Sequence, residues 1–132
     1  MSAIRGKNTR PELVVRRCLH AAGFRYRLHE KTLPGKPDLV LRKYKAAVFV
    51  HGCFWHQHHC PAFKFPVERE DFWRLKIGAN VMRDKAVLAE LVSQGWRIAL
   101  VWECMVKGKR AESAIARLAR WLQSESDFLE IG

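Results

Sequence analysis

The residues best suited to chemistry are concentrated at positions 51–60, which hold four histidines and two cysteines. Thiolate and imidazole are the ligands that zinc prefers, and four of them form a closed structural site. Cys53 and Cys60 are natural ligands, and Cys104, after a predicted strand, is the best candidate for a ligand from elsewhere. One further ligand would come from three nearby histidines: His56, His58 or His59. The pattern predicts a zinc staple, although buried thiols beside surface histidines would also fit it.

A second candidate centre surrounds Asp38, which follows the Pro-Gly-Lys-Pro turn signal at 34–37 and opens a predicted strand. An aspartate in such a place is most often a surface turn residue. Cleavage of a phosphodiester, however, needs a hard oxygen ligand for Mg²⁺ and a group that activates water. Asp38 could supply the first, and the imidazoles of His51 and His56 could supply the second. Glu12 would join this site if the first helix packs across the end of the sheet.

The charge of the chain favours a polyanionic partner. Its 132 residues contain 24 Lys and Arg against 13 Asp and Glu, which gives a formal net charge of +11. Such a surface attracts phosphates and releases counterions on binding, so nucleic acid is the simplest partner, with an inert basic surface as the alternative. The length suits one domain with one core. No apolar run approaches the ~20 residues of a membrane helix, and the N-terminus lacks a secretory signal, so we expect a soluble intracellular protein.

Seven elements would position these residues, in the order α-β-β-β-α-β-α. The predicted helices span 9–22, 71–94 and 111–123, and the predicted strands span 24–28, 38–41, 46–50 and 96–102. The second and third strands can pair as a hairpin, which would bring Asp38 near Val50 and His51. A helix between the third and fourth strands allows a crossover, so the predicted class is α/β with a mixed four-stranded sheet. The apolar side of the long helix would be formed by Phe72, Leu75, Val81, Leu88, Leu91 and Val92.

Aromatic side chains close to basic ones are a further signal. Phe54, Trp55 and Trp73 stand near Lys64 and Arg74 in the sequence. Aromatic wedges can enter a base step and kink DNA, and a mismatched step unstacks more easily than a paired one. The flanking cations would contact phosphate and set the register. The alternative is that the rings are core residues, which is the better interpretation of Trp73 when it is taken alone.

Five motifs extend over nearly the whole chain. They are Lys7-Asn8-Thr9-Arg10-Pro11-Glu12, then 34–38, then 49–60, then Phe72-Trp73 with Lys76-Ile77-Gly78, and finally Trp102-Glu103-Cys104. Together they resemble the very-short-patch-repair (Vsr) family of DNA mismatch endonucleases, and the His/Cys stretch is highly specific to it. The resemblance implies a restriction-endonuclease-like core and a single Vsr-like domain over residues 1–132.

The resemblance also implies an activity, namely a strand-specific nick on the 5′ side of the thymine in a T:G mismatch left by deaminated 5-methylcytosine. Asp38 would hold Mg²⁺ together with the backbone carbonyl of Val50. His56 would activate water, and His51 and Glu12 would complete the site. The zinc ligands would be Cys53, His58, Cys60 and Cys104. Family members often carry a threonine at the position of Val50, and valine suffices there if only the carbonyl reaches the metal.

The aromatic residues would, by the same resemblance, insert beside the mismatch. The partner would be mismatched duplex DNA, with mismatch-repair proteins and a DNA polymerase for resynthesis as further partners. We expect a cytoplasmic monomer that associates with the nucleoid when bound to DNA, because a single nick needs one active site. Family members usually have a further basic segment before the position of Met1. Two other interpretations stay open: a zinc-containing nucleic-acid-binding module without catalysis, and a nuclease of this fold with another DNA substrate.

Overall fold

The computed structural model describes residues 9–52 and 69–132, apart from the side chains of residues 70 and 73. The helices are α1 (Arg10–Ala21), α2 (Glu70–Ser93) and α3 (Arg110–Leu122), and two short 3-10 turns are η1 (Arg42–Tyr44) and η2 (Glu103–Val106). The strands are β1 (Arg27–Leu28), β2 (Leu39–Leu41), β3 (Ala46–His51), β4 (Arg97–Trp102) and β5 (Phe128–Ile131).

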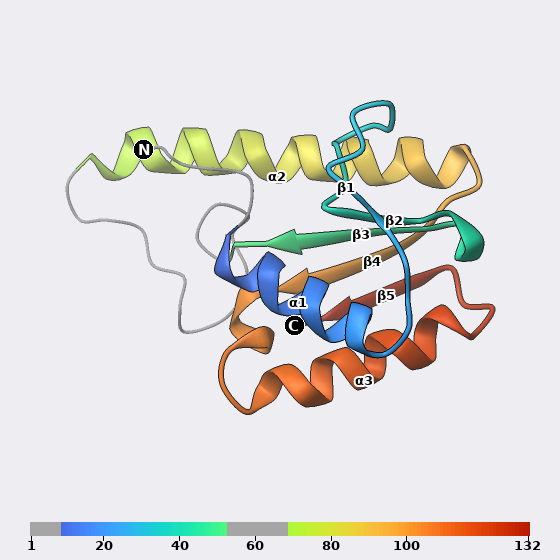
Figure 1. Ribbon diagram of the computed structural model, residues 1–132. Coiled ribbons are helices and arrows are strands. Elements are labelled where there is room, and N and C mark those ends of the chain that lie inside the picture. Colours follow the sequence, from blue (N-terminus) through green and yellow to red (C-terminus); the bar gives the residue numbers. More distant parts are fainter. Residues whose placement is uncertain (1–8, 53–68) are drawn as a thin grey trace.

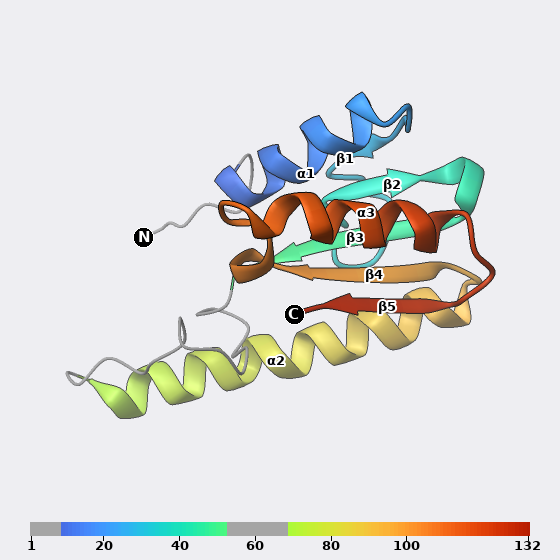
Figure 2. The ribbon, with the colours of Figure 1, turned by 90° about the horizontal axis from the view of Figure 1, so that it is seen from below.

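The strands of the described chain form one mixed sheet in the order β1-β2-β3-β4-β5. β1 pairs antiparallel with β2, and β2 pairs antiparallel with β3. β3 pairs in parallel with β4, and β4 pairs in parallel with β5. α2 connects β3 to β4 across one face of the sheet, and α3 connects β4 to β5 across the other face, beside α1 (Figures 1 and 2). The sheet therefore lies between two helical layers. This arrangement confirms the α/β class and is consistent with a restriction-endonuclease-like fold.

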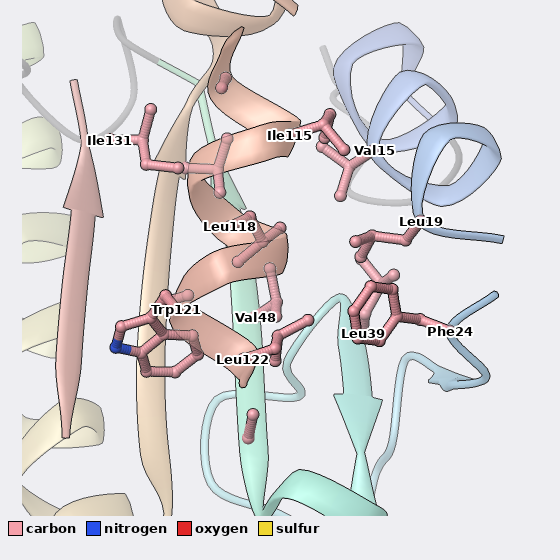
Figure 3. Packing of buried hydrophobic residues seen from close by; sticks show 14 of the residues in the cluster. Val15, Leu19, Phe24, Leu39, Val48, Ile115, Leu118, Trp121, Leu122 and Ile131 are labelled. Carbon is pink, nitrogen blue, oxygen red and sulfur yellow. The ribbon is translucent and has the colours of Figure 1, made fainter. Parts of the chain in front are cut away.

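Successive side chains of a strand point to opposite faces of the sheet, so the core has two parts. On one face, Val15 of α1 and Leu118 of α3 pack with Val48 of β3 (Figure 3). On the other face, Leu91 of α2 packs in a cluster with Phe49 of β3. β3 is buried almost throughout, as expected for a strand that is covered on both sides. This central strand ends at the site described below.

The sheet contains a fifth strand that the sequence analysis did not predict, so the four-stranded prediction was wrong. β5 pairs in parallel with β4 at the edge of the sheet. The Arg97 guanidinium supports the connection from α3 to β5 by donating hydrogen bonds to three carbonyl oxygens, those of Trp121, Leu122 and Ser126. A strand of four residues is too short to show a period of two, and Ile131 is the one fully buried residue in it.

Two other elements differ from their predicted form. Only Arg27–Leu28 of the predicted strand 24–28 is a strand, because Phe24 turns into the core instead. On α2, Leu91 is buried as predicted, but Phe72, Leu75 and Val92 are 43%, 79% and 56% exposed. The first turns of α2 extend past the ends of the strands (Figure 2), so they lie beyond the surface on which the rest of the helix packs. Within the described residues, no helix has both the length and the apolarity needed to cross a membrane.

Candidate active site

A cleft of about 850 Å³ lies at the carboxyl ends of β3 and β4, next to the start of α1. Figure 1 shows these ends of the elements on the same side of the molecule. Its lining comes from the first turn of α1, the turn before β2, the end of β3, the residue after β4 and the middle of α2. β2 enters the sheet at this same end because it runs antiparallel to β3. Ligands of open α/β sheets bind outside the carboxyl ends of the strands. The cleft is therefore the candidate site.

Asp38 lies in this cleft, directly before β2. Its Oδ2 accepts a hydrogen bond from the backbone N–H of Val50 at 2.6 Å, which confirms the hairpin predicted from the sequence. Burial raises the pKa of Asp38 from its ordinary 3.8 to about 7; the Val50 hydrogen bond lowers it, nearby Glu12 raises it, and Arg16 lowers it. The carboxyl group thus sits where its negative charge is poorly solvated and only partly compensated.

Glu12 is buried next to Asp38, with only 2% of its side chain exposed. Its Oε2 accepts hydrogen bonds from the hydroxyl and the backbone N–H of Thr9, at 3.0 and 3.4 Å. Its Oε1 lies 3.2 Å from Arg16 Nη2 and 2.9 Å from His29 Nε2. α1 therefore packs across the end of the sheet as expected, and its third residue brings a second carboxylate to the cleft.

The sequence analysis missed His29. One ligand atom each from Glu12, His29 and Asp38 lies within 4.8 Å of the others. The signal that could have found His29 is the register of β1 and β2. Leu28 of β1 pairs with Leu39 of β2, so His29, directly after β1, lies opposite Asp38, directly before β2. That signal becomes available only once the pairing of β1 with β2 is known, because nothing in the sequence links a histidine after a two-residue strand to an acid nine residues later.

His51 is the last residue of β3 and lines the cleft. It is 7% exposed, and its ring makes edge contacts with Phe49 and Trp102, with centroids 5.8 and 5.2 Å apart. These contacts fix the plane of the imidazole. The structure therefore brings Glu12, Asp38 and His51, three of the four predicted catalytic residues, to one cleft.

The α2 part of the cleft is rich in polar and basic groups. Lys76, Asn80 and Arg83 line it at helical spacing, so they share one face of α2. Arg83 Nη2 donates a hydrogen bond to Asn80 Oδ1 at 2.8 Å. Lys36, in the turn before β2, adds another cation to the lining. The cleft thus combines the buried carboxylate of Glu12 and the half-buried one of Asp38 with exposed cations, and cations of this kind bind the oxygens of a phosphate backbone.

Several predicted site residues lie outside the described part of the chain: Cys53, Phe54, Trp55, His56, His58, Cys60, Lys64 and the side chain of Trp73. Arg74 is exposed on α2, and Cys104 is half-buried in η2, directly after β4. The zinc ligands and the aromatic wedge therefore remain predictions.

The acidic part of the cleft has the donor set of a hard divalent cation. Carboxylate oxygens of Asp38 and Glu12 lie close together. Burial is the main cause of the raised pKa of Asp38 and leaves its ionised form poorly solvated, so a bound cation would stabilise that form. Mg²⁺ is typically held by one or two carboxylates and keeps several water ligands. The residues present thus fit Mg²⁺ at Asp38.

Comparison with known proteins identifies the family of the chain. The family model described as DNA mismatch endonuclease Vsr matches residues 1–62. The chain is 40% identical to the DNA mismatch endonuclease Vsr of Escherichia coli (strain K12), over 99% of this chain and 86% of that protein. It is 51% identical to the type II nicking enzyme V.XorIIP of Xanthomonas oryzae pv. oryzae, over 79% of this chain and 76% of that protein. It is also 47% identical to the type II nicking enzyme V.NmeAIP of Neisseria meningitidis, over 83% and 78% of the two chains.

Together with the fold and the cleft, these similarities define the class of protein, which is a DNA endonuclease. More narrowly, the chain belongs to the Vsr family of DNA mismatch endonucleases. The resemblance seen in the sequence motifs is thereby confirmed.

Proposed function

We propose that this enzyme makes a Mg²⁺-dependent nick in one strand of duplex DNA, on the 5′ side of the thymine in a T:G mismatch. Such mismatches arise from deaminated 5-methylcytosine, and the nick would start very short patch repair. The observation that carries the proposal is the pair of carboxylates, Asp38 and Glu12, in a cleft to which α2 contributes the cations Lys76 and Arg83 beside Asp84. Buried acids would only repel the phosphates of DNA in a pure binding module, so their presence favours a metal-dependent nuclease.

Asp38 and the backbone carbonyl of Val50 would hold the Mg²⁺. When bound, the ion would supply a Lewis acid for the phosphate oxygens and lower the pKa of a water ligand. The backbone of Val50 already contacts Asp38 through its N–H, so a side-chain hydroxyl at this position is not needed to fix the acid. Glu12, which is held by Thr9 and Arg16, would accept hydrogen bonds from water in the site.

Proton transfer would be the task of the two histidines. His56 would take the proton of the attacking water, and an imidazole suits this role because its ordinary pKa lies close to neutrality. His51 would help to orient that water. The contacts of its ring with Phe49 and Trp102 support this role, because a fixed ring plane gives each nitrogen a fixed direction.

DNA would be held by cations and probed by aromatic rings. Lys64 and Arg74 would bind phosphates, together with the cleft cations Lys76 and Arg83. The wedge would consist of the three aromatic residues that the sequence analysis singled out: Phe54, Trp55 and Trp73. A wedge that unstacks the duplex selects a mismatch because a mismatched step resists deformation less.

Zinc would hold the chain between β3 and α2, bound by Cys53, His58, Cys60 and Cys104. A closed site of two or three thiolates with imidazole is structural rather than catalytic. The metal content of the purified protein checks this prediction, with one zinc per chain expected. A clearly lower content in carefully prepared protein would count against it.

The nicking specificity is tested with labelled duplexes that differ at one position, T:G, T:A and the other mismatches, each with and without Mg²⁺. We expect a single nick 5′ of the thymine in T:G only, and only with the metal. Asp38→Asn should lower nicking by roughly 10³-fold or more, because several kcal/mol of transition-state stabilisation are lost, while DNA binding is retained. Equal nicking of T:G and T:A by the parent enzyme would reject mismatch specificity, and an active Asp38→Asn variant would remove Asp38 from the mechanism.

In the cell, the nick must be followed by removal and resynthesis of a short patch. Mismatch-repair proteins and a DNA polymerase are therefore the proposed partners. We propose a cytoplasmic monomer that associates with the nucleoid when bound to DNA.

A further inference from the structure

His29 contacts both acidic residues of the site, Asp38 through the backbone and Glu12 through its ring. Its backbone N–H donates to the carbonyl oxygen of Asp38 at 3.2 Å, and its ring Nε2 lies 2.9 Å from Glu12 Oε1. The His29 side chain is 17% exposed, and that of Glu12 is 2% exposed. None of the roles assigned above uses this histidine.

The backbone holds His29 in an uncommon conformation. Its φ of 48° lies in the left-handed region, which residues other than glycine rarely adopt. Residues in such conformations persist only where the surrounding structure restrains them, and they cluster at functional sites. Here the restraints are the bond to the Asp38 carbonyl at one end and the contact with Glu12 at the other.

The direction of the contact with Glu12 follows from the chemistry of its partners. An ionised carboxylate only accepts hydrogen bonds, so the hydrogen must be on Nε2 of His29, which donates to Oε1. Arg16 Nη2 lies 3.2 Å from both Oε1 and the His29 Nε2, and a guanidinium only donates. Its hydrogen bond therefore goes to the carboxylate.

A metal ion bound jointly by Glu12, His29 and Asp38 is the competing explanation of the cluster. The Arg16 guanidinium argues against it, because this cation already lies within hydrogen-bond distance of both Oε1 and Nε2. A second cation on the same two atoms would meet the repulsion of the first. His29 is therefore better placed as a hydrogen-bond donor than as a ligand.

We infer that His29 is a positioning residue, which fixes the Glu12 carboxylate beside Asp38 through a hydrogen bond from Nε2. Thr9 holds one oxygen of Glu12, and the donors His29 and Arg16 hold the other, so the carboxylate plane cannot turn. The inference rests on the proposed role of Glu12 in nicking.

The experiment compares nicking of the T:G duplex at saturating Mg²⁺ by the parent, His29→Ala, His29→Gln, Glu12→Ala and the double variant lacking both side chains. We expect His29→Ala to lower kcat by about 10- to 100-fold at unchanged KM for DNA, as for other partners that orient site residues. Glutamine also offers an N–H donor, so His29→Gln should recover most of kcat. In the Glu12→Ala background, loss of His29 should cost nothing further. His20→Ala, which removes an exposed histidine of the same helix as Glu12, should leave kcat unchanged.

Two further measurements separate positioning from metal ligation. Calorimetric titration with Mg²⁺ and with Mn²⁺ should give the same affinity ratio for the parent and His29→Gln, whereas a nitrogen ligand would favour Mn²⁺ in the parent only. ¹⁵N NMR of the imidazole should show hydrogen on Nε2, with a resonance that shifts in Glu12→Ala. Multiplying losses in the double variant, no recovery in His29→Gln, or a changed metal ratio would each overturn the inference. If the parent fails to nick T:G at all, the proposed function fails, while the NMR and calorimetric results still decide how His29 acts.

Discussion

Asp38 keeps a carboxyl group where water solvates its charge poorly, so its chemistry and its effect on stability are linked. Burial raises the pKa of this group to about 7 in the folded protein, and Glu12 beside it acts in the same direction. In the unfolded chain the pKa returns to its ordinary value. Between the two values the folded state binds a proton that the unfolded state has released, so the free energy of unfolding falls as the pH rises.

This difference predicts the pH dependence of Asp38→Asn in Mg²⁺-free buffer. The amide cannot ionise, so the variant should gain stability over the parent from about pH 4 up to about pH 7 and hold the gain above it. We expect a gain of about 1–3 kcal/mol at pH 8, measured by denaturant unfolding, since each pKa unit is worth about 1.4 kcal/mol and solvent reduces the full effect. Asp127→Asn, at an exposed position, is the matched control. A difference between the Asp38 variant and parent that does not change with pH would show that Asp38 ionises normally.

Local patterns predicted Asp38 but not His29, and the reason is physical. Asp38 follows a turn and precedes a short apolar strand, and a second apolar strand begins only a few residues after the first one ends. The short connection between these strands was enough to predict antiparallel pairing and the approach of Asp38 to Val50, which the 2.6 Å hydrogen bond confirms. His29 itself has a left-handed backbone conformation directly after a two-residue strand, and this conformation brings its ring to Glu12. Such a turn has no periodic sequence pattern from which it could be predicted.

At the scale of elements, the position of α2 depends on the turn before β2. Gly35 in this turn has a φ of +74°, and a Cβ built on it would overlap Cγ1 of Val87 on α2. Both residues line the cleft. The width of the cleft at this point is therefore set by a close approach that only glycine permits.

Two glycine substitutions test this packing in opposite directions. Gly35→Ala should lower the free energy of unfolding by about 1–3 kcal/mol, through both strain at a positive φ and overpacking against Val87. Gly78→Ala, inside α2, should raise it by up to about 1 kcal/mol through helix propensity, because among the described residues no atom outside the adjoining helix lies within 4 Å of the added methyl group. Denaturant unfolding measures both changes. A neutral Gly35→Ala would show that the turn and α2 do not pack as described.

Elements with a long pattern were predictable, and short or overhanging ones were not. The three helices and the crossover between β3 and β4 follow from apolar spacing and helix-capping signals over a dozen residues or more. β5 has four residues, and it is recognisable mainly through its pairing with β4. The spacing of Phe72 and Leu75 alone predicts core positions. Both are exposed because the start of α2 projects past the sheet, and the local sequence does not indicate this projection.

At the scale of the whole molecule, the excess of 24 basic over 13 acidic residues acts together with the shape of the cleft. The excess attracts any polyanion, whereas the cleft decides which cations lie near the cleaved phosphate. Arg83 lines the cleft, while Lys85, two residues further along α2, is exposed and does not line it. These neighbours form a matched pair for separating the two effects.

The salt dependence of DNA binding should distinguish these two cations. Arg83→Gln should weaken binding to matched and mismatched duplexes alike and reduce the slope of log K against log salt by about 0.9, the value for one phosphate contact. Lys85→Gln should change the slope far less. Fluorescence anisotropy at several salt concentrations measures both slopes. Equal effects of the two substitutions would mean that the net charge, not the cleft, governs the contact with the backbone.

The hydrogen bonds from Thr9 to Glu12 give one carboxylate two duties, since the same group secures the first turn of α1 and borders the reacting centre. Substitution of Glu12 would therefore weaken the start of the helix as well as the chemistry, and denaturant unfolding measured beside kcat separates the two losses. The α2 lining carries no such double duty at Lys76 and Arg83, which are exposed. Redesign of substrate preference therefore has far more freedom on the α2 side of the cleft than at its acids.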